Sequence, residues 1–138
     1  MILPAFILSA VLSSAMADGT ASITVTVDGI EIGSGHLVVG LYDSAEGWDG
    51  ETAIDGRRVA VTGDVAEIEF GPLPAGRYGI KMYHDVDDDG QLDTNLMGIP
   101  SEPFAFSNNA MGRFGPAAWP DASFAVDAGE NAHAMSFR

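Results

Sequence analysis

Hydrophobic and polar residues alternate along most of the chain, which predicts short β-strands separated by turns. Ile23, Val25 and Val27 alternate with threonines, and a period of two is typical of a strand with one buried face. A more continuous apolar run at 36–43 favours a central, more buried strand. The predicted strands cover residues 23–27, 36–43, 57–61, 65–70, 77–85, 123–126 and 132–137. In the strand at 77–85, one face holds Tyr78, Ile80, Met82 and His84, and the other holds Arg77, Lys81 and Tyr83.

Turn residues separate these strands, and no window of helical length has a convincing period of 3.6 residues. In the segment 71–76, Pro72 and Pro74 cannot donate to a strand ladder, so we expect a tight connection there. About seven short strands with Gly, Pro and Asp turns predict an all-β fold, a single antiparallel β-sandwich.

One long irregular segment, residues 93–121, interrupts the strand pattern. It is rich in Gly, Pro, Asn and aromatic residues. Long loops in compact domains are often functional, which favours a binding role. The alternative is a packed loop whose aromatic residues cap an open end of the sandwich. These residues are Phe104, Phe106, Phe114 and Trp119.

The amino-terminal segment has the character of a secretory signal peptide. Residues 2–12 carry no charge but are too few for a membrane span, which needs roughly 20 apolar residues. Ala15-Met16-Ala17 fits the small-x-small cleavage rule. We therefore predict a signal peptide at 1–17, a single domain at 18–138, and a periplasmic or extracellular protein without an integral membrane segment after cleavage. The absence of Lys or Arg near Met1 is atypical, and a buried first helix is the alternative.

Charge and composition exclude several classes of partner and of chemical site. The formal net charge of −14 argues against nucleic acid or an anionic membrane surface as a partner. The chain contains no Cys, so disulfides, thiolate metal sites and a cysteine nucleophile are excluded.

The most specific local pattern is an acidic loop at 85–93. In a calcium loop, oxygen ligands stand at positions 1, 3, 5, 7 and 9, and a glycine at position 6 allows a sharp turn. Here the ligand positions hold Asp85, Asp87, Asp89, Gln91 (through its carbonyl) and Asp93, with Gly90 at position 6. Asp88 adds a fifth carboxylate, and five negative charges in nine residues repel one another unless a cation binds. The spacing therefore predicts a calcium site.

The loop departs from an EF-hand in two respects. Position 12 is Leu96 instead of a bidentate Glu, and a strand rather than a helix precedes the loop. We expect an EF-like loop of weak affinity, with the missing ligand supplied by Asn95, Glu102 or water. Magnesium fits less well because it usually keeps several waters. The alternative is an acidic, solvated turn that holds no ion.

Other candidate chemistry is weaker. His36, His84 and His133 form no HExxH motif, although His84 adjoins the acidic loop. Ser34 lies in Gly-Ser-Gly without the GxSxG pattern of a nucleophile elbow, so a turn is favoured. Two tryptophans, Trp48 and Trp119, could stack on sugars but are more often packing residues.

Several motifs occur together between residues 73 and 119. They are Leu73-Pro74-Ala75-Gly76-Arg77-Tyr78, His84 through Asn95, Gly98-Ile99-Pro100 with Glu102, Phe106-Ser107-Asn108-Asn109, and Gly115-Pro116. In these motifs the chain closely resembles the bacterial DUF2141 family, whose members are small, exported and functionally uncharacterised. One departure is Asp87 and Asp89 where the family often has Asn, which should strengthen cation binding. The resemblance implies a compact domain, and its LPAGxY turn is similar to that of Ig-like, prealbumin-like and carboxypeptidase-regulatory-like sandwiches, an analogy of fold only.

The first functional hypothesis is an exported, non-enzymatic binding or structural module with no catalytic residues and calcium as its cofactor. Calcium at the 85–93 loop would order the 93–121 loop, and this monomer would present it to an unidentified protein or glycan. A second hypothesis is a small metal-assisted hydrolase that uses His84 and neighbouring carboxylates. A third is an envelope domain in which calcium only stabilises the fold.

Overall fold

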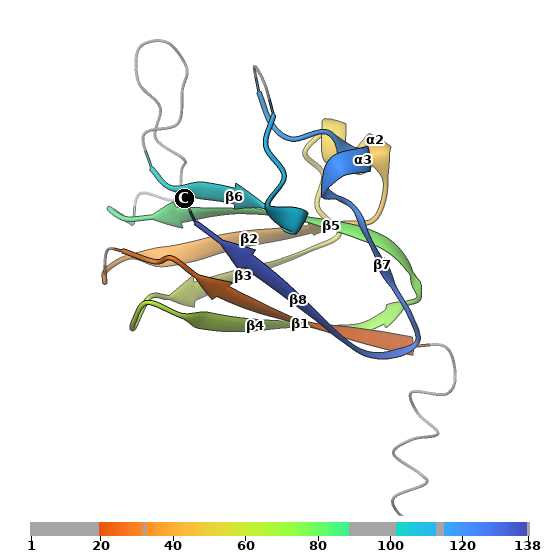
Figure 1. The fold of residues 1–138 in the computed structure, drawn as a ribbon, viewed down its shortest axis with the longest axis horizontal. Helices are drawn as coiled ribbons and strands as arrows, with labels where there is room; N and C mark the ends of the chain where they lie inside the picture. Colours follow the sequence, from red (N-terminus) through yellow and green to blue (C-terminus); the bar gives the residue numbers. More distant parts are fainter. Residues whose placement is uncertain (1–19, 32, 89–101, 113–114, 138) are drawn as a thin grey trace, which may run out of the picture.

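The computed structural model describes residues 20–31, 33–88, 102–112 and 115–137, and these form two β-sheets (Figure 1). The strands are β1 (Thr20–Asp28), β2 (His36–Tyr42), β3 (Asp55–Ala60), β4 (Ala66–Pro74), β5 (Gly76–Asp85), β6 (Phe104–Phe106), β7 (Phe124–Val126) and β8 (Gly129–Ser136). The described residues also contain three short helices: α2 (Ala45–Asp49), η1 (Ser107–Asn109) and α3 (Trp119–Ala122). The predicted all-β sandwich-like fold is confirmed. The predicted signal peptide, 1–17, lies outside the described residues.

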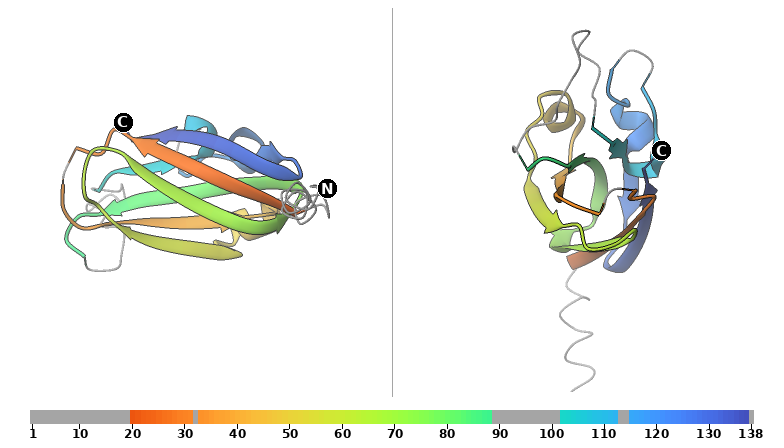
Figure 2. Two further views of the ribbon diagram at one scale, coloured as in Figure 1. Left: turned by 90° about the horizontal axis from the view of Figure 1, so that it is seen from below. Right: turned by 90° about the vertical axis from the view of Figure 1, so that its left-hand side faces the viewer.

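The sheets stack as two layers (Figure 2). One has the strand order β4-β1-β8, and the other has the order β3-β2-β5-β6, with β7 also paired to β5. Neighbouring strands are antiparallel except β1 and β8, which run parallel from Ala21 opposite Gly129 to Asp28 opposite Ser136. The prediction of a purely antiparallel sandwich is therefore wrong at this pair. Alternation along a strand reports its buried face but not the direction of its neighbour, which is why the sequence missed it.

The main core lies between the sheets and matches the alternation in the sequence. In β1 the predicted inward residues Ile23, Val25 and Val27 are fully buried. The inward face of β5 holds buried Tyr78, Ile80, Met82 and His84, again as predicted. Apart from His84, these inward residues pack into one hydrophobic cluster shared by both sheets.

Two predicted boundaries are wrong. Residues 71–74 do not form a tight connection, because β4 continues to Pro74, which lies opposite Thr20. The strand tolerates Pro72 and Pro74 because β4 is an edge strand, where a missing N–H breaks no ladder on the open side. The segment 93–121 is also more regular than expected, since its described part contains β6, η1 and the start of α3.

A second, smaller aromatic cluster packs around α2 and α3, which lie side by side in Figure 1. The rings of Trp48 and Trp119 meet with centroids 5.8 Å apart above Gly79 of β5. A Cβ at Gly79 would lie 2.8 Å from Trp48 and 2.9 Å from Trp119, so the cluster requires glycine there. Phe104 and Phe106 join the same cluster, which supports the packing interpretation of these aromatic residues. Phe114 lies outside the described residues.

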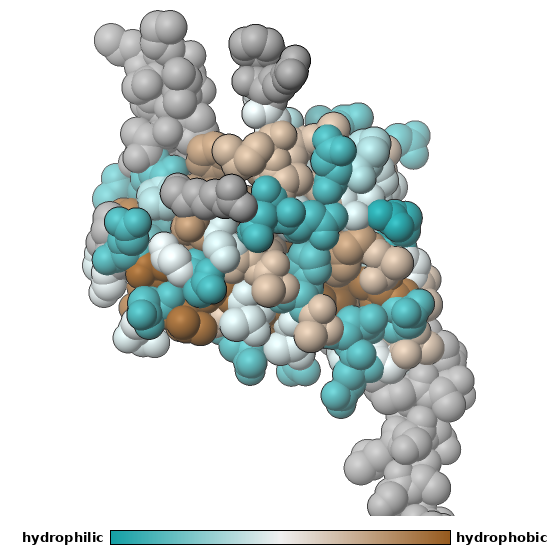
Figure 3. Space-filling view, in the orientation of Figure 1, coloured by the Kyte–Doolittle hydropathy of each residue, from teal (hydrophilic) through white to brown (hydrophobic). Residues whose placement is uncertain are grey.

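The surface drawn in Figure 3 mixes hydrophilic and hydrophobic residues. Strongly hydrophobic colour shows only in small, separate areas of the described residues on this face. Three large apolar side chains of the described segments are well exposed, namely Ile54, Val65 and Met111.

Candidate metal site

The candidate site begins where strand β5 ends. Asp85 is the last residue of β5, lies opposite His36 of β2, and is completely buried. Gly35 makes this position possible: its φ is +76°, and a Cβ there would lie 2.1 Å from the carbonyl oxygen of Asp85. The predicted Gly33-Ser34-Gly35 turn therefore packs directly on the backbone that leads into the acidic loop.

Three carboxylates converge at this end of the sheet. One oxygen each from Asp85, Asp87 and Glu102 lies within 4.8 Å of the others. Asp85 is 0% exposed and Glu102 8% exposed, while Asp87 is open to solvent. Hard oxygen ligands at this spacing suit Ca²⁺ or Mg²⁺, so we call Asp85, Asp87 and Glu102 the acidic triad.

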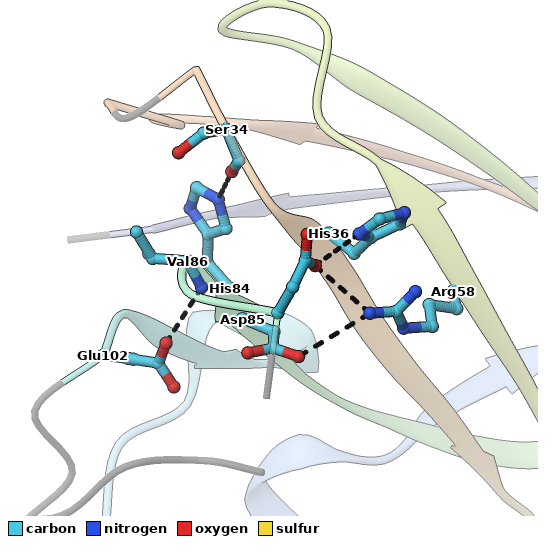
Figure 4. Close-up of polar contacts among 8 residues, drawn as sticks. Ser34, His36, Arg58, His84, Asp85, Val86 and Glu102 are labelled. Carbon is cyan, nitrogen blue, oxygen red and sulfur yellow. Dashed lines mark hydrogen bonds and ion pairs between the residues drawn. The ribbon is translucent and has the colours of Figure 1, made fainter. Parts of the chain in front are cut away.

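Glu102 reaches the triad through backbone contacts that join distant parts of the chain. Its Oε2 accepts a hydrogen bond from the N–H of Val86 at 2.8 Å (Figure 4). Beside it, the N–H of His84 donates to the carbonyl of Pro103 at 2.8 Å. These two bonds tie the start of the 102–106 segment to the end of β5, which fixes the carboxylate of Glu102 next to the loop.

Asp88 pairs with two basic side chains instead of joining the triad. Its Oδ1 accepts from Nδ1 of His36 at 2.6 Å and from Arg58 at 3.1 Å. The same Arg58 guanidinium lies 3.9 Å from Oδ2 of Asp85. Arg58 is therefore the counter-charge closest to the triad among these contacts, and it is shared between two carboxylates.

The structure brings together only part of the predicted ligand set. Asp85 and Asp87 lie in the triad, as the spacing predicted. Asp89, Gln91 and Asp93 lie outside the described residues, as does Asn95. Glu102, one of the two residues considered for the missing ligand, is the third carboxylate of the triad.

The three histidines have separate environments. His84 is 1% exposed, and its Nε2 donates to the carbonyl of Ser34 at 2.6 Å (Figure 4). The hydrolase hypothesis, which needs His84 in a concave pocket beside a reactive partner, stays a prediction. His36 holds Asp88, as described above. His133 lies on β8 and stacks on Phe124, and burial lowers its pKa from the ordinary value of 6.5.

Trp48 and Lys81 contact each other at the aromatic cluster. Nε1 of Trp48 donates to the carbonyl of Ala117 at 2.8 Å, and Trp48 is 2% exposed. The Lys81 ammonium donates to the carbonyl of Trp48 at 2.6 Å and lies over the Tyr42 and Trp48 rings. Burial lowers the pKa of Lys81, and the charges of Glu51 and Asp49 oppose this shift. Trp48 is therefore a packing residue, and Lys81, predicted on the outer face of β5, helps to hold it.

Fold and site together define a small β-sandwich domain with an acidic triad at one end of its larger sheet. A family model described as an uncharacterized protein conserved in bacteria (DUF2141) matches residues 25–134. The match covers most of the chain, so the protein belongs to the DUF2141 family, as its motifs predicted. No curated protein and no solved structure matches the chain, and the prealbumin-like analogy therefore stays a prediction.

Within the described segments, each helix is too short or too polar to cross a bilayer.

Proposed function

We propose that the protein is an exported, non-enzymatic β-sandwich module that binds calcium at the acidic triad. The observation that carries this proposal is the approach of three carboxylates to within 4.8 Å of one another, two of them buried. Like charges at this separation repel, and burial strengthens the repulsion by lowering the effective dielectric constant. A divalent cation would offset that repulsion.

Calcium is the ion that the ligands favour. It accepts a flexible shell of six to eight oxygens from carboxylates and backbone carbonyls, whereas magnesium demands a near-octahedral shell and keeps waters. The loop spacing adds Asp89, the Gln91 carbonyl and Asp93 as further predicted ligands, which together with the triad would supply such a shell. Weak affinity would suit an extracellular or periplasmic location, where the ion is abundant.

Thermal unfolding in excess EDTA, in calcium and in magnesium tests the proposal. A ligand that binds only the folded state at about 100 times its Kd adds about 2.7 kcal/mol. For a domain near this size we expect calcium to raise Tm by about 5–15 °C. Glu102→Gln should remove most of this rise, because the amide carries no charge. The amide oxygen can still accept from the Val86 N–H, so the variant tests the charge alone.

Glu69→Gln is the matched control. Glu69 is an exposed acid on β4, in the other sheet from the triad, so the same loss of charge should leave the calcium effect intact. Equal losses in Glu102→Gln and Glu69→Gln would contradict the site. So would a wild-type Tm that no divalent cation changes.

We infer that the bound ion would order the start of the following loop, 93–121, and that this loop is the surface for a protein or glycan partner. The position of the triad supports this inference. Asp85 and Glu102 lie at the two ends of the chain segment between them, and the triad brings these ends together. Capture of a partner in calcium and its release in EDTA would support this role. Capture that is the same in both would assign calcium a purely stabilising role.

A further inference from the structure

The imidazole of His133 lies where β8 meets η1 and β7. It stacks on the ring of Phe124, with centroids 3.9 Å apart and planes inclined by 13°. Its Nε2 accepts a hydrogen bond from the backbone N–H of Asn108 at 3.1 Å. A ring nitrogen that accepts carries no proton, so this contact requires neutral imidazole with its proton on Nδ1.

The backbone of Asn108, which donates this hydrogen bond, has an uncommon conformation. Its φ is +61°, in the left-handed region. Its side-chain amide donates to the carbonyls of Asp121 and Ser123. The His133 bond therefore connects the last strand to the turn that carries η1 and supports α3.

The groups around the ring are mostly uncharged. Its β1 neighbour is Val25, and η1, β6 and β7 contribute no titratable side chains. Where β5 pairs with β7 it contributes Arg77 and Tyr78. The titratable groups of the other elements are Asp28 of β1, Asp121 of α3 and Glu130 of β8. Arg77 is bound to Ser123, and Tyr78 donates to the carbonyl of Pro74. Burial is the cause that lowers the pKa of His133.

We propose that His133 is a pH-sensitive latch, which holds the Asn108 turn on β8 when the imidazole is neutral and releases it when the imidazole is protonated. A proton from solvent would occupy Nε2, so both ring nitrogens would become donors and neither could accept from Asn108. Asn108 is exposed, and its N–H would then turn to water. Stacking on Phe124 would not oppose this, because a cationic ring also interacts favourably with an aromatic face.

Besides the side-chain bonds of Asn108, bonds from both neighbouring residues of η1 involve no titratable group. The side chain of Asn109 accepts from the N–H of Ser136 at 3.0 Å, and the Ser107 hydroxyl donates to the carbonyl of Ala122 at 2.6 Å. Protonation should therefore loosen the turn at Asn108 and leave these anchors closed.

The direction of the pH effect follows from linkage. The pKa of His133 in the folded protein lies below 6.5, so the unfolded chain or open turn takes up the proton first as pH falls. The closed latch is fully present above pH 6.5 and weakens as pH falls through 6.5 toward the folded-state pKa.

Amide hydrogen exchange at pH 7.5 and 5.5 tests the latch, with EDTA present so that metal binding does not contribute. After correction for intrinsic exchange, we expect Asn108 protection to fall about threefold to tenfold at pH 5.5, the range that one net hydrogen bond supplies. The Ser136 amide, held by Asn109, should change little. His133→Phe keeps an aromatic ring but no acceptor, so its Asn108 amide should be weakly protected at both pH values.

Unchanged Asn108 protection in the wild type would overturn the proposal, and so would a pH effect that persists in His133→Phe. A ring ¹⁵N titration of the wild type is a second test that needs no variant. We expect the Nδ1–H tautomer at neutral pH and a His133 pKa below 6.5. The Nε2–H tautomer, or a pKa above 6.5, would rule out the latch.

Discussion

Ser107 links three segments through one buried hydroxyl. Its Oγ accepts from the N–H of Ile80 at 2.9 Å and donates to the carbonyl of Ala122 at 2.6 Å, and the residue is 0% exposed. Ser107→Ala would leave the Ile80 N–H buried without that acceptor, which costs about 1–3 kcal/mol. Urea unfolding should show this loss. Thr62→Ala, at an exposed position between β3 and β4, should stay within about 0.5 kcal/mol of wild type, and equal effects would contradict the role of Ser107.

Among individual residues, Asp85 and Asp87 could be predicted as ligands from the sequence, because they lie close together along the chain. It offered Glu102 only as one of three alternatives, because contact between Glu102 and Val86 depends on how the chain returns to β5. It also counted the charge of Asp88 among those that favour a cation, without making Asp88 a ligand. Asp88 is instead bound by His36 and Arg58, which only the pairing of β2, β3 and β5 places nearby.

At the scale of the elements, Lys81 fastens helix α2 to strand β5. Its ammonium donates to the carbonyl of Trp48 and lies 4.6 Å and 4.8 Å from the ring centroids of Trp48 and Tyr42. Lys81→Met keeps an unbranched side chain but removes the charge and the donor. We expect it to lower stability by about 1.5–3 kcal/mol, the range for a hydrogen bond to a charged group. Tryptophan emission should shift to the red, because Trp48 and Trp119 become more exposed.

Arg57→Met is the matched control for this prediction. Arg57 also lies over an aromatic ring, that of Phe70 at 4.7 Å, but it is on edge strand β3 and pairs with Asp55. Its loss should leave tryptophan emission unchanged. A red shift in Arg57→Met, or none in Lys81→Met, would mean that Lys81 does not hold α2.

The elements themselves were largely predictable, since alternation fixes the buried face of a strand wherever one face is buried. The sequence therefore located seven of the strands, β1, β2, β3, β4, β5, β7 and β8, and identified the inward residues of β1 and β5. It missed β6, η1 and both α-helices, because each has only three to five residues and lies in a segment rich in turn residues. The start of β8 was also missed, because Asn131 is a turn-former; here its side chain closes the turn from within the strand by bonding Asp127.

At the scale of the whole molecule, charge is the feature that acts on every part. The formal net charge is −14, and a large net charge destabilises a compact state through self-repulsion. Neighbouring groups bind each basic residue of the described segments, namely Arg57, Arg58, Arg77 and Lys81. A stabilising effect of calcium could therefore arise from general screening as well as from the acidic triad.

Salt separates these two effects. In EDTA, raising NaCl from about 0.01 M to 0.2 M shortens the screening length from about 30 Å to below 10 Å, so Tm should rise gradually and equally in wild type and Glu102→Gln. Calcium at fixed ionic strength should instead give a saturable rise in wild type and little in Glu102→Gln, because its effect depends on the third carboxylate of the triad. Tm measured against both salts for both proteins decides between them. If NaCl of equal ionic strength reproduced the calcium effect, screening would account for all of it, and the triad would be an acidic cluster without an ion.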